Sequence, residues 1–169
     1  MQKKRIMQKH LNLKELQKKI LSLSESLVVL DQWKSDCQKV VFTNGCFDVF
    51  HYGHLHLLYQ SKILGDKLIV GLNNDKSIAS LKGSKRPIYN QEQRSAILSA
   101  ISFVDLIIVF SEQTPLNLIK TIKPDIITKG SDYKINQVVG RNEVINKGGK
   151  VILIPLIKNL SSSNVLKEI

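Results

Sequence analysis

The chain has 169 residues, of which 43% are hydrophobic and 23% are charged, as is usual for a globular domain. This length suits one α/β domain with a real core and is too short for two comfortable ones. No apolar run reaches the roughly 20 residues of a membrane span, and Lys and Gln interrupt the N-terminus, where a secretory signal would be apolar. The two cysteines, Cys37 and Cys46, are too few for a disulfide framework, so we expect a cytoplasmic protein.

The formal net charge of +11 raises the question of a nucleic-acid partner. Residues 1–19 carry seven basic side chains against one acidic one, and they therefore hold more than half of the excess. The rest of the chain has no basic stripe interleaved with aromatic residues, which a single-strand groove would need. We therefore expect a solvated basic tail, no nucleic-acid partner, and a positive field that suits anionic small molecules.

The first predicted element is an amphipathic helix in the N-terminal part of the chain. After a tail over residues 1–9, apolar residues recur at spacings of three and four between Leu11 and about Leu30. They are Leu13, Leu16, Ile20, Leu23 and Leu27. We expect this helix to pack on the domain or on a partner subunit. The predicted division is therefore a tail and helix over residues 1–36 and a main domain over residues 37–169.

From residue 37 onward, short apolar runs alternate with helical patterns. They predict strands over residues 40–43, 67–73, 106–110, 126–129 and 151–155. Helices are predicted over residues 54–64, 91–101, 114–123 and 137–147, with Thr114 as a cap and Pro115 at the first helical position, and Ser161-Ser162-Ser163-Asn164 would cap a last one. A polar segment with Lys82, Gly83, Lys85, Arg86 and Pro87 predicts a mobile loop. Because the strands are apolar on both faces, we expect a Rossmann-like, five-stranded parallel sheet with helices on both faces.

The stretch from Val40 to His54 carries the clearest functional signal. A strand, a glycine-containing turn and a helix start follow one another there, with His51 and His54 on either side of Gly53. Both imidazoles can face one ligand from the first helical turn, where unpaired N–H groups and the helix dipole attract phosphate. This layout predicts a polyphosphate site, with two capping or packing histidines as the structural alternative.

Polar segments follow most of the predicted strands. In parallel sheets, ligands bind beyond the carboxyl ends of the strands, at the point where the strand order reverses. We therefore expect the segments after the first, second, fourth and fifth strands to form one composite site.

The run from Gly45 to His54 resembles the HxGH signature of the cytidylyltransferase-like nucleotidyltransferase superfamily, and the serine-rich turn at 161–164 resembles its second motif. The resemblance covers about residues 38–169. Other segments look specifically like the heptose 1-phosphate adenylyltransferase domain of ADP-heptose synthases, in a stand-alone form without a sugar kinase. They are Phe42-Thr43-Asn44-Gly45, Leu81-Lys82-Gly83, Arg86-Pro87, Glu92-Gln93-Arg94, Thr114-Pro115, Pro124-Asp125 and Lys129-Gly130-Ser131-Asp132-Tyr133. One departure is Ser162-Ser163, where threonines are common, but the hydroxyls are kept.

The resemblance implies that ATP and a sugar 1-phosphate give an ADP-sugar and pyrophosphate by direct in-line attack, with Mg²⁺ bridging the phosphates. It makes His51, His54 and Lys82 the catalytic residues, which would hold the triphosphate and stabilise its charge. The nucleotide would contact Phe42, Thr43, Asn44, Gly45, Phe47, Asp48, Gly53, Lys129, Gly130, Asp132, Ser161, Ser162 and Ser163. Lys85, Arg86 and Arg94 would bind substrate phosphate, although Arg94 suits a structural ion pair equally well. Asp48 would either shape the turn or help to hold the metal.

Two other functions stay open at this stage. A sister enzyme would use CTP and a polyol phosphate such as glycerol 3-phosphate, because sequence hardly reports the contacts that select the base. A protein of another class would bind nucleotide or nucleic acid without catalysis. The resemblance further implies a bacterial cytoplasmic protein that supplies heptose for the lipopolysaccharide core, and a homodimer or larger homo-oligomer.

Overall fold

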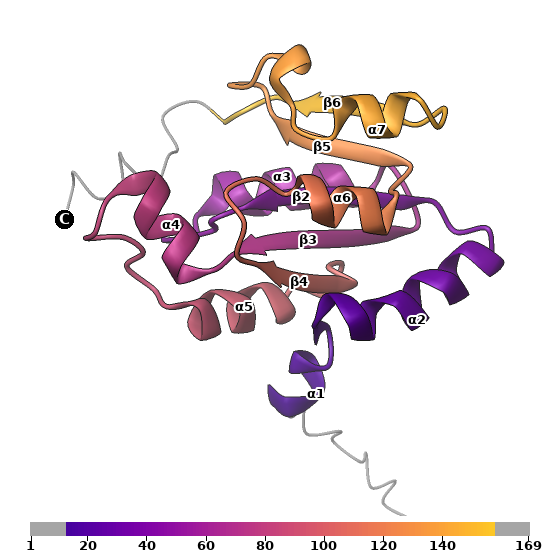
Figure 1. The fold of residues 1–169 in the computed structure, drawn as a ribbon. Coiled ribbons are helices and arrows are strands. Elements are labelled where there is room, and N and C mark those ends of the chain that lie inside the picture. The colour runs from indigo at the N-terminus through magenta and orange to yellow at the C-terminus, as the bar shows by residue number, and fades with distance from the viewer. Residues whose placement is uncertain (1–12, 158–169) are drawn as a thin grey trace, which may run out of the picture.

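Parallel strands form the centre of the molecule. The computed structural model describes residues 13–157, and there a six-stranded parallel sheet has the order β1-β4-β3-β2-β5-β6 (Figure 1). The strands consist of nearly continuous apolar runs because helices cover both faces of the sheet. They are β1 Ile20–Leu21, β2 Val40–Gly45, β3 Lys67–Asn73, β4 Leu106–Phe110, β5 Ile126–Gly130 and β6 Lys150–Ile154.

Helices divide between the two faces, and Figure 1 shows α6 in front of the sheet and α3 behind it. One core lies between the sheet and α2, α6 and α7, and it includes the buried Leu30, Leu118 and Val144. A second core lies on the other face and includes Leu58 of α3 and Leu98 of α5. The helices are α1 Leu13–Gln17, α2 Leu23–Ser35, α3 Tyr52–Lys62, α4 Asp75–Lys82, α5 Gln91–Ser99, α6 Leu116–Ile122 and α7 Arg141–Ile145, with a 3₁₀ turn η1 at Ile135–Gln137.

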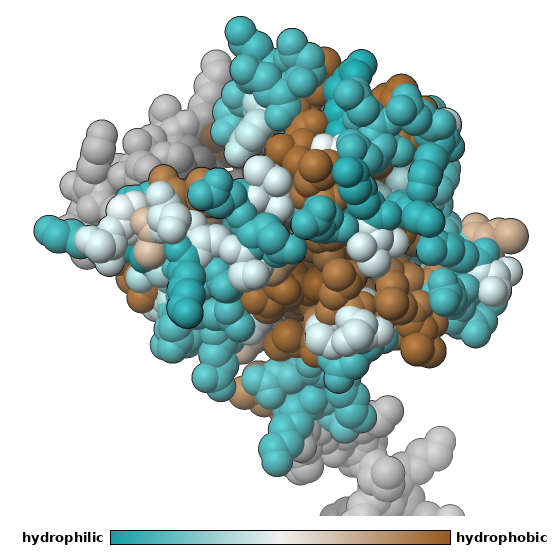
Figure 2. Space-filling view, in the orientation of Figure 1, coloured by the Kyte–Doolittle hydropathy of each residue, from teal (hydrophilic) through white to brown (hydrophobic). Residues whose placement is uncertain are grey.

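Apolar side chains also gather at the surface between α2 and α6, on the face that Figure 2 shows. Leu23, Phe110 and Leu118 line a shallow hollow there, and Val28 of α2 is 76% exposed. None of the helices within residues 13–157 is long and apolar enough to cross a bilayer.

The parallel α/β fold is confirmed, but the single helix predicted between residues 11 and 30 is wrong. Ile20 and Leu21 interrupt it by forming β1, an edge strand that pairs with β4. Ser22 then starts α2, because its side chain accepts a hydrogen bond from Glu25 N while the Glu25 carboxylate accepts one from Ser22 N. This capping box begins a new helix inside the apolar stripe, and β1 gives the sheet six strands instead of the five predicted.

Three further differences concern helices. The sequence predicts no helix between residues 73 and 91, yet Asp75–Lys82 form α4, which Asn74 caps by accepting a hydrogen bond from Ser77 N. Helix α6 begins at Leu116, with Pro115 in place of Thr114 as the N-cap residue. The pattern over residues 137–147 splits into η1 and α7, because Gly140 turns the chain there with a φ of 81°. The helix predicted after Ser161–Ser163 lies outside the described residues.

The order of the strands reverses next to β2. From β2 the chain continues to β3 and β4 on one side, and it returns to β5 and β6 on the other. Gly71 of β3 allows close packing beside this point, since a Cβ there would lie 2.8 Å from the Phe42 ring and 3.1 Å from Asn44 Cβ. In parallel sheets a ligand is expected at such a reversal, between the carboxyl ends of β2 and β5.

Candidate active site

A cleft of about 590 Å³ opens at the carboxyl ends of the strands. Its walls come from the segments that follow β2, β3, β4, β5 and β6, together with the first turn of α3 and the last turn of α4. Small-molecule sites in proteins have volumes of about 300–1,000 Å³, so the cleft is large enough for a nucleotide or a sugar phosphate.

His51 and His54 cap α3 with one nitrogen each. His51 Nδ1 accepts a hydrogen bond from Gly53 N at 3.1 Å, and His54 Nδ1 accepts one from His51 N at 3.4 Å. A neutral imidazole that accepts at Nδ1 carries its proton on Nε2. The two rings stack with centroids 3.9 Å apart, and both residues line the cleft. The pair therefore offers two Nε2–H donors at the N-terminus of a helix.

Burial keeps both imidazoles neutral. It lowers the pKa of His51, and burial together with the neighbouring His51 and Lys82 lowers the pKa of His54 to about 3, against a smaller opposite effect of Asp48. His54 also packs against the Phe47 ring, with ring centroids 5.3 Å apart. At neutral pH the pair can donate hydrogen bonds to phosphate oxygens without mutual charge repulsion.

Lys82 supplies a cation beside this pair. It is the last residue of α4, it lines the cleft, and its charge reaches His54 strongly enough to lower the pKa of that imidazole. The helix gives Lys82 a defined backbone position, although the sequence indicated a mobile loop. Lys85 is exposed and does not line the cleft.

The turn between β2 and α3 has an unusual backbone. Phe47 and Val49 both have a φ of 47°, a left-handed backbone conformation that residues other than glycine rarely adopt. Strain of this kind persists only where the surroundings enforce it, and here it lies directly before the histidine pair.

Asp48, between these two residues, fixes the turn from inside. It is 1% exposed, and it accepts hydrogen bonds from the backbone N–H groups of Ile88 and Tyr89 and from the side chain of Arg86, its ion-pair partner. Burial alone would raise the pKa of Asp48, but these donors outweigh burial and hold the pKa below its usual value. The structure therefore assigns Asp48 and Arg86 to the shaping of the turn.

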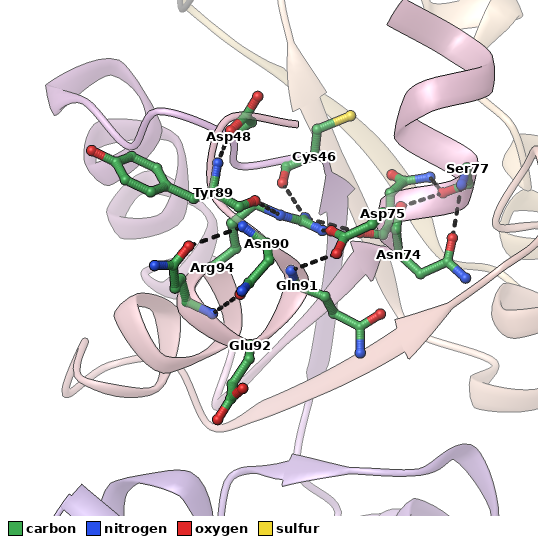
Figure 3. Close-up of polar contacts among 12 residues, drawn as sticks. Cys46, Asp48, Asn74, Asp75, Ser77, Tyr89, Asn90, Gln91, Glu92 and Arg94 are labelled. Carbon is green, nitrogen blue, oxygen red and sulfur yellow. Dashed lines mark hydrogen bonds and ion pairs between the residues drawn. The ribbon is translucent and has the colours of Figure 1, made fainter. Parts of the chain in front are cut away.

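Arg94 forms hydrogen bonds with several separate segments of the chain, as Figure 3 shows. The residue is 1% exposed, and its guanidinium donates to the carbonyl oxygens of Cys46, Asn73 and Tyr89 at 2.7 to 3.0 Å. It also pairs with the Asp75 carboxylate at 2.7 Å. Of the two roles that the sequence allows for Arg94, the structure therefore gives the structural ion pair, and Arg94 does not line the cleft.

Lys129 and its neighbours form the other end of the cleft. Lys129 Nζ donates to Asn44 O at 2.7 Å and lies 5.2 Å from the centre of the Tyr133 ring. Burial lowers the pKa of Lys129 to about 8, while Cys46 and Asp132 act in the opposite direction.

Most of the residues that the sequence singles out come together in this cleft. Phe42 and Thr43 are exceptions, because their side chains are fully buried, and Thr43 Oγ1 donates to Thr128 O within the sheet. Arg86 does not line the cleft either, and Ser161, Ser162 and Ser163 lie outside the described residues. The predicted residues that do line the cleft are Asn44, Gly45, Phe47, Asp48, His51, Gly53, His54, Lys82, Lys129, Gly130 and Asp132.

Sequence reasoning missed the segment after β4 as part of the site. Gln113, Thr114 and Pro115 line the cleft, as does Gln137 of η1. A signal was available for the first three, since the carboxyl ends of all parallel strands meet at one edge of the sheet. No local sequence pattern predicts that Gln137 lines the cleft, because its position depends on the tertiary placement of η1.

The described residues do not provide a protein-held metal site. No group of three or more His, Cys, Asp or Glu side chains within residues 13–157 could hold an ion. Asp48, the carboxylate that the sequence offered for this role, is bound to Arg86 and to two backbone N–H groups.

Known proteins resemble this chain over most of its length. The model of the cytidylyltransferase-like family matches residues 42–168. The bifunctional protein HldE of Paramagnetospirillum magneticum is 46% identical over 150 residues, and that of Campylobacter fetus is 46% identical over 153 residues. These matches cover 89% and 90% of this chain but 31% and 32% of the two relatives. The chain thus spans about a third of the length of the curated relatives it matches.

Two solved structures show the same architecture. The lipopolysaccharide core biosynthesis protein from Thermoplasma volcanium is 32% identical, with a TM-score of 0.58 over 72% of this chain and 98% of that protein. Pantothenate synthetase from Thermus thermophilus has a TM-score of 0.62 over 87% of this chain and 67% of its own, at 19% identity. The second likeness is one of fold alone.

Proposed function

Since the chain belongs to the cytidylyltransferase-like family, we propose that this nucleotidyltransferase transfers AMP from MgATP to a heptose 1-phosphate. An oxygen of the sugar phosphate attacks the α-phosphorus of ATP in line. The bond from that phosphorus to the bridging oxygen breaks, and the electron pair leaves with pyrophosphate, so that ADP-heptose is the other product. The observation that carries this proposal is the stacked pair of His51 and His54, which offers two Nε2–H donors at a helix N-terminus.

The reaction needs positioning and charge stabilisation more than covalent chemistry. Negative charge grows on the oxygens around the α-phosphorus and on the departing pyrophosphate. Neutral N–H donors at the start of α3 and the Lys82 ammonium suit this task, because all of them line the cleft and the charge of Lys82 acts on His54. Ser161, Ser162 and Ser163 would hold the β- and γ-phosphates, as the resemblance implies.

The choice of acceptor is supported by the relatives. The chain is 46% identical to proteins named HldE and 32% identical to a lipopolysaccharide core biosynthesis protein. The segments around Lys82 and Lys129 are among those that resemble ADP-heptose synthases. A cytoplasmic location and a homo-oligomer remain predictions from the same resemblance.

The test is pyrophosphate release from purified protein with Mg²⁺, in which ATP and CTP are each combined with heptose 1-phosphate and glycerol 3-phosphate. We expect turnover with ATP and heptose 1-phosphate. His54→Ala should lower kcat by about 10²- to 10³-fold, as the loss of one transition-state hydrogen-bond donor typically does. His56→Ala is the matched control, since His56 lies on the same helix but does not line the cleft.

Other outcomes would change the proposal in defined ways. Turnover with CTP and glycerol 3-phosphate would keep the site and replace both substrates. Equal losses in the two histidine variants would remove the assigned role of His54. The absence of pyrophosphate release in every combination would contradict the proposed function.

A further inference from the structure

The two ends of the cleft lie on opposite sides of the sheet. Thr128 of β5 faces α3, because its hydroxyl is 2.7 Å from the Ser61 hydroxyl of that helix. Neighbouring residues of a strand point to opposite faces, so Lys129 points away from α3. Its contact with Asn44 O crosses from β5 to β2, at the point where the strand order reverses.

The end beside α3 is suited to a polyphosphate, because N–H donors gather there at a helix N-terminus. The histidine pair and Lys82 lie there, and among the charged groups that act on His54 are Lys82 and Asp48. Lys129 is influenced instead by Cys46 and Asp132. The cleft therefore has two separate cationic ends, which suit a reaction between two anionic substrates.

The Lys129 end also has unused hydrogen-bonding capacity. An ammonium has three N–H donors, and within the described residues Nζ of Lys129 has one hydrogen-bond partner, the Asn44 carbonyl. The Asn44 side-chain oxygen Oδ1 is buried without a partner among those residues. A buried acceptor without a donor is costly, and a ligand hydroxyl in the cleft would supply that donor.

The chemistry of the walls indicates the class of this ligand. Gln113, Thr114 and Gln137, whose side chains carry amide and hydroxyl groups, line the same cleft, as does Tyr133, whose ring lies beside Lys129. Amides and hydroxyls match the hydroxyls of a polyol, and an aromatic ring can pack on the apolar face of a sugar ring. A phosphate would accept hydrogen bonds from the remaining N–H donors of Lys129 and would be a stronger, charged partner than the Asn44 carbonyl.

We propose that the Lys129 end of the cleft binds the sugar phosphate acceptor, with Lys129 holding the acceptor phosphate and Asn44 Oδ1 accepting from a sugar hydroxyl. This inference rests on the proposed function, in which the triphosphate occupies the histidine end. It assigns Lys129 to the acceptor, whereas the resemblance assigns it to the nucleotide.

A consequence for pH dependence follows from the groups around Lys129. The titratable groups that face it are Cys46, Asp132 and Tyr133, and burial lowers the pKa of Lys129 to about 8. A bound phosphate dianion favours the protonated ammonium, so the acceptor should bind less tightly as the pH rises above this value, and binding near it should take up a proton.

The test compares Lys129→Met with Lys134→Met, a matched control because Lys134 is exposed and does not line the cleft. In Lys129→Met, the KM for heptose 1-phosphate should rise at least about tenfold while the KM for ATP stays within about twofold. Lys134→Met should leave both unchanged. A rise in the KM for ATP alone, or a fall in kcat with both KM values unchanged, would overturn the proposal.

Calorimetric titration separates this inference from the proposed function, because binding needs no turnover. Wild-type protein titrated with heptose 1-phosphate near pH 8, in two buffers of different ionisation enthalpy, should take up protons, and Lys129→Met should not. If the wild type binds in this way but releases no pyrophosphate, the proposed function fails and the acceptor site stands. Turnover with an unaltered acceptor KM in Lys129→Met would leave the function intact and refute the site. A wild type that does not bind the sugar phosphate would also refute it.

Discussion

At the N-terminus of α3, each histidine can serve two tasks with two different nitrogens, of which one caps the helix and the other is proposed to bind the ligand. Nδ1 accepts a backbone N–H and closes the helix end, while Nε2–H remains for a ligand in the cleft. A lysine could donate to phosphate but has no acceptor with which to cap the helix. The spacing of three residues between His51 and His54 therefore serves the helix and the site together.

The depressed pKa of His54 should appear as acid sensitivity of the fold. Its pKa is about 3 in the folded protein, against an ordinary value of 6.5. Between these values the unfolded chain binds a proton that the folded chain does not, so the free energy of unfolding should fall as the pH falls below 6.5. His54→Asn keeps an acceptor for His51 N and removes the titration, so its stability should fall less steeply. Urea unfolding between about pH 4 and 7 measures both slopes, and parallel slopes would exclude a buried neutral imidazole.

Asp48→Asn tests the anchoring of the strained turn. The change leaves Arg86 without its charged partner in a nearly buried position, and breaking such a pair typically costs about 3 kcal/mol of unfolding free energy. Asp31→Asn is the surface control, since its side chain is 77% exposed and its ion pair with Lys34 is long, at 3.9 Å. The control should change stability by less than about 0.5 kcal/mol. Similar urea midpoints for the two variants would contradict the assigned role of Asp48.

Secondary-structure elements with a clear local sequence pattern could be predicted, whereas elements that depend on tertiary pairing could not. Strands β3 and β4 are predicted to the residue, because buried parallel strands are continuous apolar runs between polar segments. By contrast, β1 has two residues and exists through its pairing with β4, which no local pattern reports. In the site, the histidine pair is a local motif, whereas the network around Arg94 joins segments distant in sequence and appears only in three dimensions.

The end of α6 offers a test of backbone conformation. Lys123, the C-cap residue, has a left-handed backbone with φ 54° and ψ 56°, and its side chain is exposed. A left-handed conformation costs a residue other than glycine about 1–2 kcal/mol. Glycine also gives the unfolded chain more conformational entropy, which offsets part of this gain. Lys123→Gly should therefore raise the unfolding free energy by about 0.5–1 kcal/mol.

Lys120→Gly is the matched control one turn earlier in α6. Lys120 lies within the helix and is exposed, so glycine there should lower stability by about 1 kcal/mol. Opposite signs for the two variants in urea unfolding are the expected result. A loss in both would mean that the left-handed backbone at position 123 carries no penalty.

For the whole molecule, the N-terminal part of the described chain belongs to the same packed body as the site. Leu30 of α2 is 2% exposed and packs in one core with Val40 and Leu106, strand residues on either side of β3. Helix α2 therefore covers the sheet face opposite α3, and the position of the cleft depends on a core to which the N-terminal segment contributes.

Leu30→Ala should consequently lower the stability of the entire molecule. Loss of a buried leucine side chain costs about 2–5 kcal/mol, because transfer and cavity contributions add. Val28→Ala on the same helix is the control, since Val28 is 76% exposed and should change stability by no more than about 0.5 kcal/mol. When the leucine variant is titrated with urea, its circular dichroism signal and its rate of pyrophosphate release should decline together. Unfolding of α2 in a separate transition would show that it is an independent unit.

The close approach at Gly71 has a consequence for how this sheet can evolve. The space that a side chain at position 71 would need is already filled by the Phe42 ring of the adjacent strand, 2.8 Å from where a Cβ would be. Gly71→Ala alone should therefore be harmful, but it should become tolerable once Phe42→Leu has vacated part of that volume. Neither position can change freely while the other stays as it is. This sign-dependent epistasis predicts that the two positions covary across homologues.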